Sequence, residues 1–406
     1  MIPSSAVPPA ARLLEAIFDR GLPADRLLAH HFREHPQSGA REREAIAGLV
    51  YEVLRHRRRL AAISARSDPE GLATAARETL SAAEEKPHPA LETGVAKEGT
   101  PAERLSYPDW LWQAMAEDRE AGETEALAAA LNEGGRVDLR VNTRLGNREE
   151  VMARFRKMGI DARATPFAPE GVRLERRVGR LPGDLQGIVE FQDEGSQLLT
   201  HLLAPREGEL VVDLCAGGGG KSLHAAVLMA GRGRIVATDV DRRRLQELSR
   251  RAKKARSGII EVLPIRHERD PHLLRLAGKV DRVLVDAPCS GTGRLRRNPE
   301  IKWQLTPAAV ENHLSRQAAL LEAAAALVRP GGTLVYATCS ILAPENQGSV
   351  TRFLAGNRQF RLLAAGDRDP FRGSGEALLN GPYLTPLPHR TGSDGFFGAI
   401  MARSSR

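Results

Sequence analysis

The stretch VVDLCAGGGGKS, residues 211–222, places an apolar run, a carboxylate and a thiol directly before four consecutive glycines. The apolar run is typical of a buried strand, and glycines at its end favour a tight turn into a helix that begins near Lys221. Ligands of open α/β sheets bind outside the carboxyl ends of the strands. This turn is therefore a candidate ligand site.

The chain after Gln192 continues to alternate strand and helix patterns. We expect strands at 209–214, 234–238, 259–264, 282–286 and 333–337, helices at about 221–230, 241–256 and 306–328, and a final strand pair near 359–364 and 396–402. Buried apolar strands that alternate with helices predict an α/β fold with a doubly wound parallel sheet.

The residues before this sheet predict two smaller parts. Residues 1–60 show helical spacing, with a first helix that ends near Gly21 and a second over 41–54 that runs into the basic cluster 55–59. Residues 64–103 favour a poorly packed helix followed by a linker. From Val137 a strand, a helix and two short strands predict a small α+β unit. We expect domains at 1–103, 104–190 and 191–406.

Composition and charge limit the classes of function that the protein can have. The 406 residues are 42% hydrophobic and 27% charged, as in ordinary globular proteins. A net charge of +8 favours a polyanionic partner, although a basic surface can also serve solubility alone. No apolar stretch is long enough for a membrane span, and the first residues lack a secretory pattern. The three cysteines are too few for a disulfide framework, which predicts a reducing, cytoplasmic location.

All three cysteines fall at the ends of expected strands. Cys215 follows the first strand, Cys289 lies in VLVDAPCSGTG (283–293) and Cys339 lies in LVYATCS (334–340). A single cysteine is more often a small buried hydrophobic residue. Three at one edge of a sheet favour a functional role.

Three ligand classes compete for the glycine turn. A P-loop requires a glycine where Cys215 stands, and a dinucleotide fingerprint requires one where Ser222 or Leu223 stands. An adenosyl cofactor needs no triphosphate cradle, and Asp239 at the end of the second strand could accept hydrogen bonds from both ribose hydroxyls. An ordinary tight turn explains one or two glycines but explains four poorly.

The segment DAPCSGTG (286–293) is the most specific in the chain. Its proline stiffens the backbone, so that Asp286 and Cys289 can be held in one geometry. The next segment, RLRRNPEIKW (294–303), combines basic residues with an aromatic one, which predicts a surface for single-stranded nucleic acid. Its candidate contacts are Arg294, Arg296, Arg297, Lys302 and Trp303, and Trp303 could instead anchor a core. The basic helix 241–256 offers phosphate contacts or only a solvated face.

Taken in order, DLCAGGGGKS, DAPCSGTG and ATCS resemble the RsmB/Sun family of RNA (cytosine-5) methyltransferases. SYPDWL (106–111), RVNT (140–143), FQDEGSQ (191–197), RRNPEIKW (296–303) and SDGFF (393–397) also look like elements of this family, so the resemblance covers roughly 104–406. Residues 1–60 resemble a shortened form of the NusB-like helical RNA-binding domain.

The resemblance implies the class I, Rossmann-like methyltransferase fold, S-adenosylmethionine as methyl donor and a cytosine of RNA, expected in 16S ribosomal RNA, as acceptor. It implies these cofactor-binding residues: Cys215, Ala216, Gly217, Gly218, Gly219, Gly220, Lys221, Asp239 and Asp286. Gly217 and Gly218 depart from the commoner CAAPGGK, which should loosen the loop and keep its shape. For the acidic residue near the adenine, Asp270 is the one candidate.

The chemistry accounts for two cysteines and a carboxylate. Carbon 5 of cytosine is a poor nucleophile until a thiolate adds to carbon 6, and a carboxylate such as Asp286 can stabilise the charge that develops at nitrogen 3. After methyl transfer the carbon 5 proton and the thiol must leave. Residue types alone do not say which cysteine attacks, because DNA cytosine methyltransferases use a Pro-Cys turn, here Cys289. The resemblance assigns attack to Cys339 and release to Cys289.

Alternative functions are the same reaction on transfer RNA, a non-catalytic RNA-binding scaffold, and a P-loop NTPase. We expect no metal, because His30 and His31 lack further ligands at zinc spacing. We also expect no membrane partner and a monomer.

Overall fold

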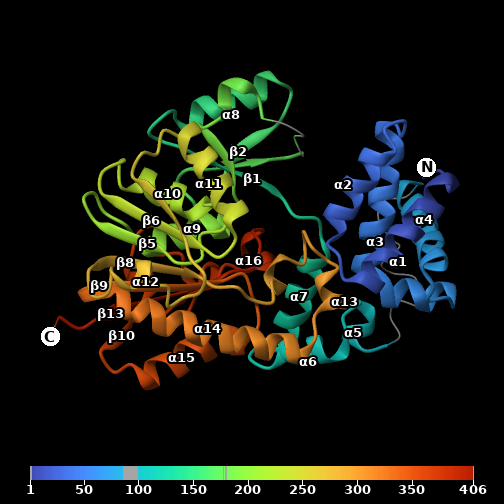
Figure 1. Ribbon diagram of the computed structural model, residues 1–406. Coiled ribbons are helices and arrows are strands. Elements are labelled where there is room, and N and C mark those ends of the chain that lie inside the picture. Colours follow the sequence, from blue (N-terminus) through green and yellow to red (C-terminus); the bar gives the residue numbers. More distant parts are fainter. Residues whose placement is uncertain (1, 86–98, 177, 179–180, 406) are drawn as a thin grey trace. The chain divides into compact units, whose positions relative to one another are not determined.

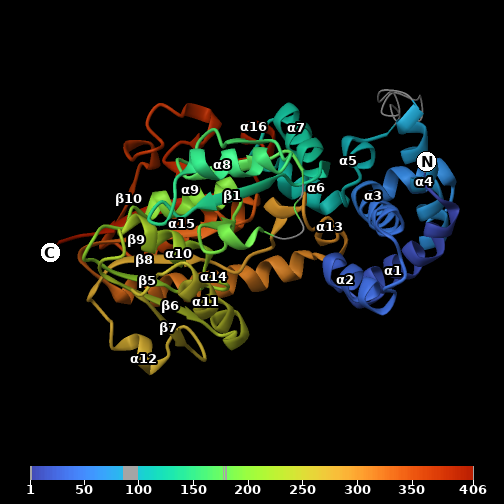
Figure 2. The ribbon, with the colours of Figure 1, turned by 90° about the horizontal axis from the view of Figure 1, so that it is seen from above.

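The computed structural model describes residues 2–85, 99–176, 178 and 181–405. They form two compact units, one of residues 1–134 with 294–307 and the other of 135–293 with 308–406 (Figure 1; Figure 2 gives a second view). Among the described helices, none is long and apolar enough to cross a membrane. The expected three domains stay a prediction.

The first unit is helical. Its elements are η1 (Ser4–Ala6), α1 (Val7–Arg20), α2 (Ala24–Glu34), α3 (Ala40–Ser64), α4 (Pro69–Glu85), α5 (Pro101–Arg104), α6 (Asp109–Ala116), α7 (Ala121–Asn132) and α13 (Ile301–Gln304). Gly21, with φ of 62°, ends α1 as expected. The second expected helix is longer than predicted, because α3 continues past a kink at His56.

Helix α4 packs better than the sequence indicated. Its residues Leu72, Ala73 and Ala76 are fully buried in a core shared with α1 and α3. The expectation of a poorly packed helix was wrong, because alanines allow helices to approach closely where larger side chains would separate them. Most of the expected linker, residues 86–98, lies outside the described residues.

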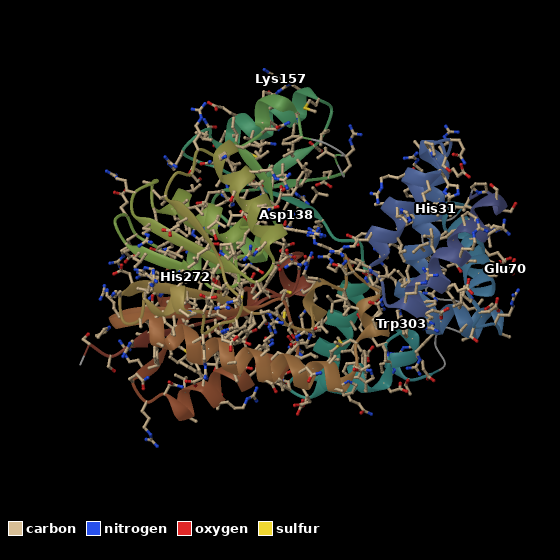
Figure 3. The ribbon with its side chains drawn as sticks, in the orientation of Figure 1. His31, Glu70, Asp138, Lys157, His272 and Trp303 are labelled. Atoms are coloured by element: carbon tan, nitrogen blue, oxygen red, sulfur yellow. The ribbon has the colours of Figure 1, made fainter. Side chains whose placement is uncertain are left out.

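The segment 294–307 belongs to the interior of this helical unit. The Lys302 ammonium is buried and donates to Arg55 O (2.7 Å), Ser106 O (3.0 Å) and Asn132 Oδ1 (2.8 Å). Trp303 is labelled in Figure 3, and its indole nitrogen donates to Leu54 O at 2.7 Å.

Arg296 is also buried. Its Nη2 donates to Glu133 Oε2 and Gly134 O, both at 3.3 Å. The expectation of a nucleic-acid surface was therefore wrong for Arg296 and Lys302, whose charges bind backbone carbonyls and nearby side chains. Trp303 anchors the core.

The second unit begins with a small antiparallel sheet in the order β2-β3-β1-β4. Its strands are β1 (Val137–Val141), β2 (Ala162–Ala164), β3 (Gly171–Leu174) and β4 (Val189–Phe191). Helix α8 (Arg148–Lys157), capped by Asn147, buries Val151 and Phe155 against Leu139 and Val172. This confirms the expected α+β pattern, to which the structure adds β4.

The large sheet runs β11-β12-β13-β9-β8-β5-β6-β7, with β10 paired to β13. Its strands are β5 (Leu210–Asp213), β6 (Arg234–Asp239), β7 (Ile260–Pro264), β8 (Val280–Asp286), β9 (Val328–Thr338), β10 (Phe360–Leu363), β11 (Leu379–Asn380), β12 (Tyr383–Leu384) and β13 (Phe397–Arg403). Strands β5 to β9 are parallel, and β13 is antiparallel to β9. The expected doubly wound α/β sheet is confirmed.

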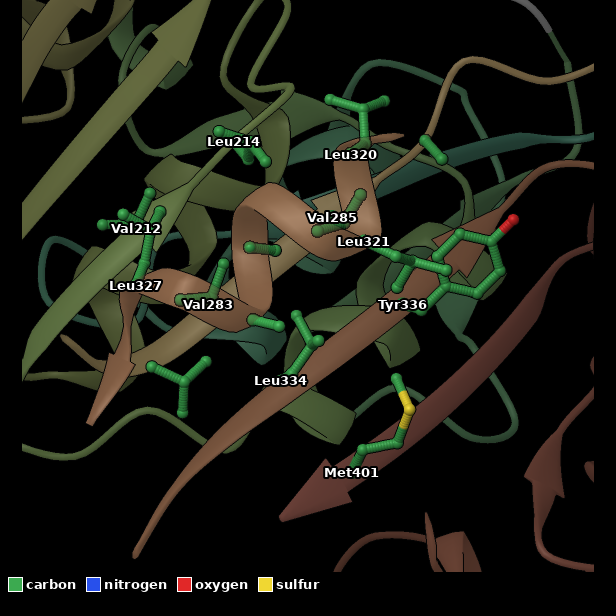
Figure 4. Packing of buried hydrophobic residues seen from close by; sticks show 14 of the residues in the cluster. Val212, Leu214, Val283, Val285, Leu320, Leu321, Leu327, Leu334, Tyr336 and Met401 are labelled. Atoms are coloured by element: carbon green, nitrogen blue, oxygen red, sulfur yellow. The ribbon is translucent and has the colours of Figure 1, made fainter. Parts of the chain in front are cut away.

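Helices cover both faces of this sheet (Figure 1). They are α9 (Glu194–Leu203), α10 (Gly220–Leu228), α11 (Arg242–Lys254), α12 (Pro271–Leu274), α14 (Pro307–Leu327), α15 (Gln347–Gly356) and α16 (Pro388–Thr391). Val212 and Val283 face α14 (Figure 4), whereas Val211 and Leu284 pack with α9 and α10. This alternation is the two-residue period of a strand that is buried on both sides.

Candidate active site

The strand order reverses at β5, which lies between β8 and β6. Such a switch point opens a crevice at the carboxyl ends of the strands, where open α/β sheets bind ligands. Cys215 follows β5, and Asp239 and Asp286 end β6 and β8. Cys339 follows β9, and Cys289 follows β8 by three residues. The structure therefore brings the sequence-predicted residues to one edge of the sheet.

The glycine turn is tied to the end of β6. The Gly217 amide donates to Asp239 Oδ2 at 2.9 Å, and the Ala216 amide donates to Thr238 O at 2.8 Å. The second oxygen of Asp239 accepts from the Asp241 amide at 2.8 Å. These bonds fix the Asp239 carboxylate beside the turn.

Gly219 has to be glycine for two reasons. Its φ is +81°, and a Cβ at this position would lie 2.0 Å from Leu248 Cδ1 of α11. The residue precedes α10, whose first amides have no partner inside the helix. The four glycines thus present backbone without side chains, next to the first amides of α10. This turn fits a nucleoside and its amino-acid tail, and these residues could hold an adenosyl cofactor.

Asp213 lies beneath the turn and is almost completely buried. Its Oδ2 accepts a hydrogen bond from Ser222 Oγ at 2.6 Å, whereas Oδ1 has no partner among the described residues. Burial raises the pKa of Asp213 to about 7, against the opposing effect of the Ser222 hydrogen bond. This carboxyl is therefore close to half protonated near neutral pH.

Lys221 and Asp286 form an ion pair. Lys221 Nζ lies 2.6 Å from Asp286 Oδ2, and the two side chains are 10% and 31% exposed. Lys221 is the second residue of α10 and Asp286 ends β8, so the pair joins the glycine turn to the segment DAPCSGTG. The lysine neutralises and orients a carboxylate that stays partly open to a ligand.

Cys289 and Cys339 meet at the same edge. Their sulfur atoms lie 3.4 Å apart, within hydrogen-bonding distance for thiols, and neither cysteine forms a disulfide. The hydrogen bond with Cys339 and burial together raise the pKa of Cys289 well above its usual value. Cys289 is therefore a protonated thiol next to a second sulfur.

The sequence analysis missed Glu345 and Gln317, which hold the turn that carries Cys289. Glu345 is fully buried, and its carboxylate accepts from the Ser290 amide (2.9 Å), from Ser290 Oγ and from Gln317 Nε2 (3.0 Å). Gln317 Nε2 also donates to Pro288 O at 3.1 Å. The segment LAPEN (342–346) lies close to Cys339 in sequence, and a carboxylate there was the one available signal.

Further contacts fix the backbone around Cys339. Asn346 accepts from Thr338 Oγ1 (2.6 Å) and donates to Ser340 O (2.9 Å), and the Gly293 amide donates to Cys339 O at 2.9 Å. A Cβ on Gly293 would lie 2.0 Å from Gly395 O, so the glycines of DAPCSGTG and SDGFF pack backbone to backbone. This rigidity preorganises the thiol.

Asp270 does not take the place foreseen for it. Its two carboxylate oxygens accept from the His272 amide (3.0 Å) and the Arg266 amide (3.1 Å) and cap α12. The side chain is buried, so the expectation of an adenine contact was wrong.

Comparison with known proteins agrees with this geometry. The family model of the 16S rRNA methyltransferase RsmB/F matches residues 200–402, and that of the ferredoxin-like domain of the same family matches 107–179. The chain belongs to the RsmB/F family. It is accordingly an S-adenosylmethionine-dependent rRNA methyltransferase with a class I methyltransferase fold, and the expected family, cofactor and activity are confirmed.

Relatives in this family align with most of the chain. A protein of Synechocystis sp. named "Probable ribosomal RNA small subunit methyltransferase B" is 36% identical over 306 residues, 74% of this chain and 68% of the relative. Ribosomal RNA small subunit methyltransferase B of Sodalis glossinidius is 35% identical over 305 residues, 75% of this chain and 67% of the relative.

Two solved structures show the same fold. The crystal structure of PH0851 has a TM-score of 0.78 at 25% identity and covers 99% of each chain. That of NSun6 from Pyrococcus horikoshii, solved with the S-adenosylmethionine analogue sinefungin, has a TM-score of 0.64 at 21% identity, with 74% of this chain and 98% of NSun6 covered. At that identity the likeness concerns the fold alone.

Proposed function

We propose that this RsmB/F enzyme methylates carbon 5 of a cytosine in 16S rRNA through a covalent intermediate on Cys339, and that Cys289 acts in its release. The observation that carries this assignment is the 3.4 Å separation of the two sulfur atoms at the ends of neighbouring strands. Addition at carbon 6 and departure from carbon 5 take place on adjacent ring atoms, and two adjacent thiols can serve both.

The steps follow from the roles of the two sulfurs. The Cys339 thiolate forms a bond with carbon 6, which makes carbon 5 the nucleophilic end of an enamine. S-adenosylmethionine supplies the electrophilic methyl group when bound. Carbon 5 then carries both the methyl group and its proton. The carbon 5 proton then passes by way of the Cys289 thiol to solvent. The electron pair that it leaves behind restores the double bond between carbons 5 and 6, and Cys339 departs from carbon 6 as a thiolate.

Asp286 supports the ring during these steps. Its carboxylate lies 2.6 Å from Lys221 Nζ, and the side chain is still partly exposed, so that it can contact a cytosine base. We assign it the stabilisation of nitrogen 3 and the exocyclic amine as charge develops there. Lys221 is then a positioning residue that holds this carboxyl group in place.

The cofactor residues are proposed from the same geometry. The backbone of residues 215–221, with its four glycines, would hold the adenosyl and amino-acid parts, and Asp286 would border them. Each oxygen of Asp239 already accepts one backbone N–H, and a carboxylate oxygen can accept a second bond. Asp239 can therefore also accept the two ribose hydroxyls.

RNA contact is assigned to the exposed basic side of α11, because the arginines there are exposed whereas Arg296 is buried. We further propose that the enzyme acts as a monomer in the cytoplasm, in keeping with its three free cysteines.

The test is methylation of unmodified 16S rRNA by the purified enzyme, followed by bisulfite sequencing, with transfer RNA offered in parallel. We expect one protected cytosine in 16S rRNA, and none with Cys339→Ala. Methylation of transfer RNA alone would move the substrate to that class. Binding of RNA without methyl transfer would leave only a scaffold.

A further inference from the structure

A second cluster of chemically capable side chains lies in this unit. Glu170 lies directly before β3, His201 lies near the end of α9 and His224 lies in α10. His224 is fully buried, and the side chains of Glu170 and His201 are 10% and 12% exposed. The three come from different elements, so local zinc spacing could not have found them.

The Glu170–His201–His224 cluster is compact enough for its three ligand atoms to close on one ion. Glu170 Oε2 lies 2.9 Å from His201 Nε2 and 3.5 Å from His224 Nε2, and all three ligand atoms lie within 4.8 Å of one another. Ligands bound tetrahedrally at about 2.0–2.2 Å lie roughly 3.3–3.5 Å apart. One oxygen and two nitrogen donors thus converge here.

His224 is the part of the cluster that a purely structural network explains least well. The ring is completely buried, and neither nitrogen makes a well-formed hydrogen bond among the described residues. Buried polar groups normally find a partner, and an imidazole nitrogen without one is costly. A metal ion would use the Nε2 lone pair that now faces Glu170 at 3.5 Å.

We propose that Glu170, His201 and His224 form a binding site for one zinc ion. Two imidazoles and a carboxylate are a common ligand set for zinc, and a water molecule would complete a tetrahedron. The ion would connect the small sheet to α9 and α10. Because α10 begins at Gly220 directly after the glycine turn, the site would stabilise the element on which the proposed cofactor cradle is built.

The test is metal content of the full-length, tag-free protein grown with zinc, measured by plasma mass spectrometry. We expect about one zinc per chain in the wild type and in the exposed control His272→Gln. The zinc content of His201→Leu should be at least tenfold lower than that of the wild type. His201→Cys should keep its zinc, because a thiolate is also a zinc ligand. A purely structural histidine would not separate leucine from cysteine in this way.

A second measurement guards against a variant that does not fold. Wild-type protein stripped with a chelator and titrated with Co²⁺ should show tetrahedral d–d absorption, and His201→Cys should add a thiolate-to-cobalt band. The wild-type melting temperature should fall on chelation and recover with zinc. A wild type that purifies without zinc, and that shows neither cobalt absorption nor a zinc-dependent melting temperature, would overturn the proposal.

Discussion

Cys289 and Cys339 contact each other through their sulfur atoms although 50 residues separate them in the chain. The reason is the register of β8 and β9, which pairs Asp286 with Ala337 and starts the two following segments side by side. A one-residue shift of this register would move each side chain to the opposite face of its strand. The cysteine pair therefore depends on strand pairing as much as on the residues themselves.

This contact leads to opposite expectations for the two cysteines. Cys339→Ala cannot form a bond to carbon 6 and should be inactive and free of adduct. Cys289→Ala can still attack and transfer the methyl group, but should stall with RNA attached through Cys339. Denaturing gels should show a slow, RNase-sensitive band for Cys289→Ala alone. The reverse pattern would make Cys289 the nucleophile, and activity in both variants would exclude covalent catalysis.

Asp239→Ala should weaken S-adenosylmethionine binding. Two ribose hydrogen bonds would be lost, about 1–3 kcal/mol, or roughly 5- to 150-fold in affinity. Calorimetry is the measurement, and the neighbouring Asp241→Ala is the control, because only the backbone amide of Asp241 contacts Asp239. Equal affinities for the two variants would contradict the ribose assignment.

Gly219→Ala should destabilise the fold, whereas Gly220→Ala should not. Alanine at Gly219 has to adopt φ near +81° with its Cβ 2.0 Å from Leu248, and we expect a loss of about 2 kcal/mol or more. At Gly220 the nearest atom is 3.9 Å away and the residue is helical, so the change should stay within about 1 kcal/mol. Urea unfolding followed by circular dichroism would measure the free energy of unfolding of both variants. Equal losses for Gly219→Ala and Gly220→Ala would contradict this explanation of Gly219.

The arginines differ in exposure, and so should their variants. Arg242→Ala with Arg243→Ala on exposed α11 should reduce the slope of log affinity against log salt by roughly two units and leave the melting temperature unchanged. Buried Arg296→Ala should lower the melting temperature instead, because Glu133 and Gly134 lose their partner. A salt slope that does not respond to the α11 pair would exclude this helix as an RNA contact.

Asp213 should make stability depend on pH. Burial raises its pKa from 3.8 to about 7, so the folded state binds the proton more tightly than the unfolded state. Its contribution is then most favourable below about pH 4 and is lost as pH rises to about 7, by roughly 4 kcal/mol at most. Asp213→Asn should therefore gain stability relative to the wild type from about pH 5 to 7 and gain no more above. Urea unfolding at several pH values measures the free energy of unfolding of both proteins. A difference between them that does not change with pH would contradict the prediction.

The sequence was a good guide wherever local pattern decides structure. The parallel strands β5 to β9 followed from apolar runs, and the motifs at their ends were expected to meet because parallel order brings strand ends to one edge. The short strands β11 and β12 were missed. Glu345, Gln317 and the Glu170–His201–His224 cluster were out of reach, since their contacts join elements far apart in sequence.

For the segment RRNPEIKW (296–303), the local pattern led to a wrong prediction. Its charges suggested a surface, but burial is decided by tertiary acceptors such as Arg55 O and Ser106 O, which no local pattern reveals. For the same reason Asp270, a carboxylate after a strand, could not be told from a helix cap.

The path of residues 294–307 bears on how this architecture could have evolved. The chain leaves the catalytic unit directly after Gly293, whose amide holds the Cys339 backbone, and returns to it by Ala308. Removal of residues 1–134 would strip Lys302 of all three of its acceptors. The helical unit is thus not encoded by one continuous stretch of the chain. Gene fusion or loss could exchange it intact only together with residues 294–307, which the gene encodes between two parts of the other unit.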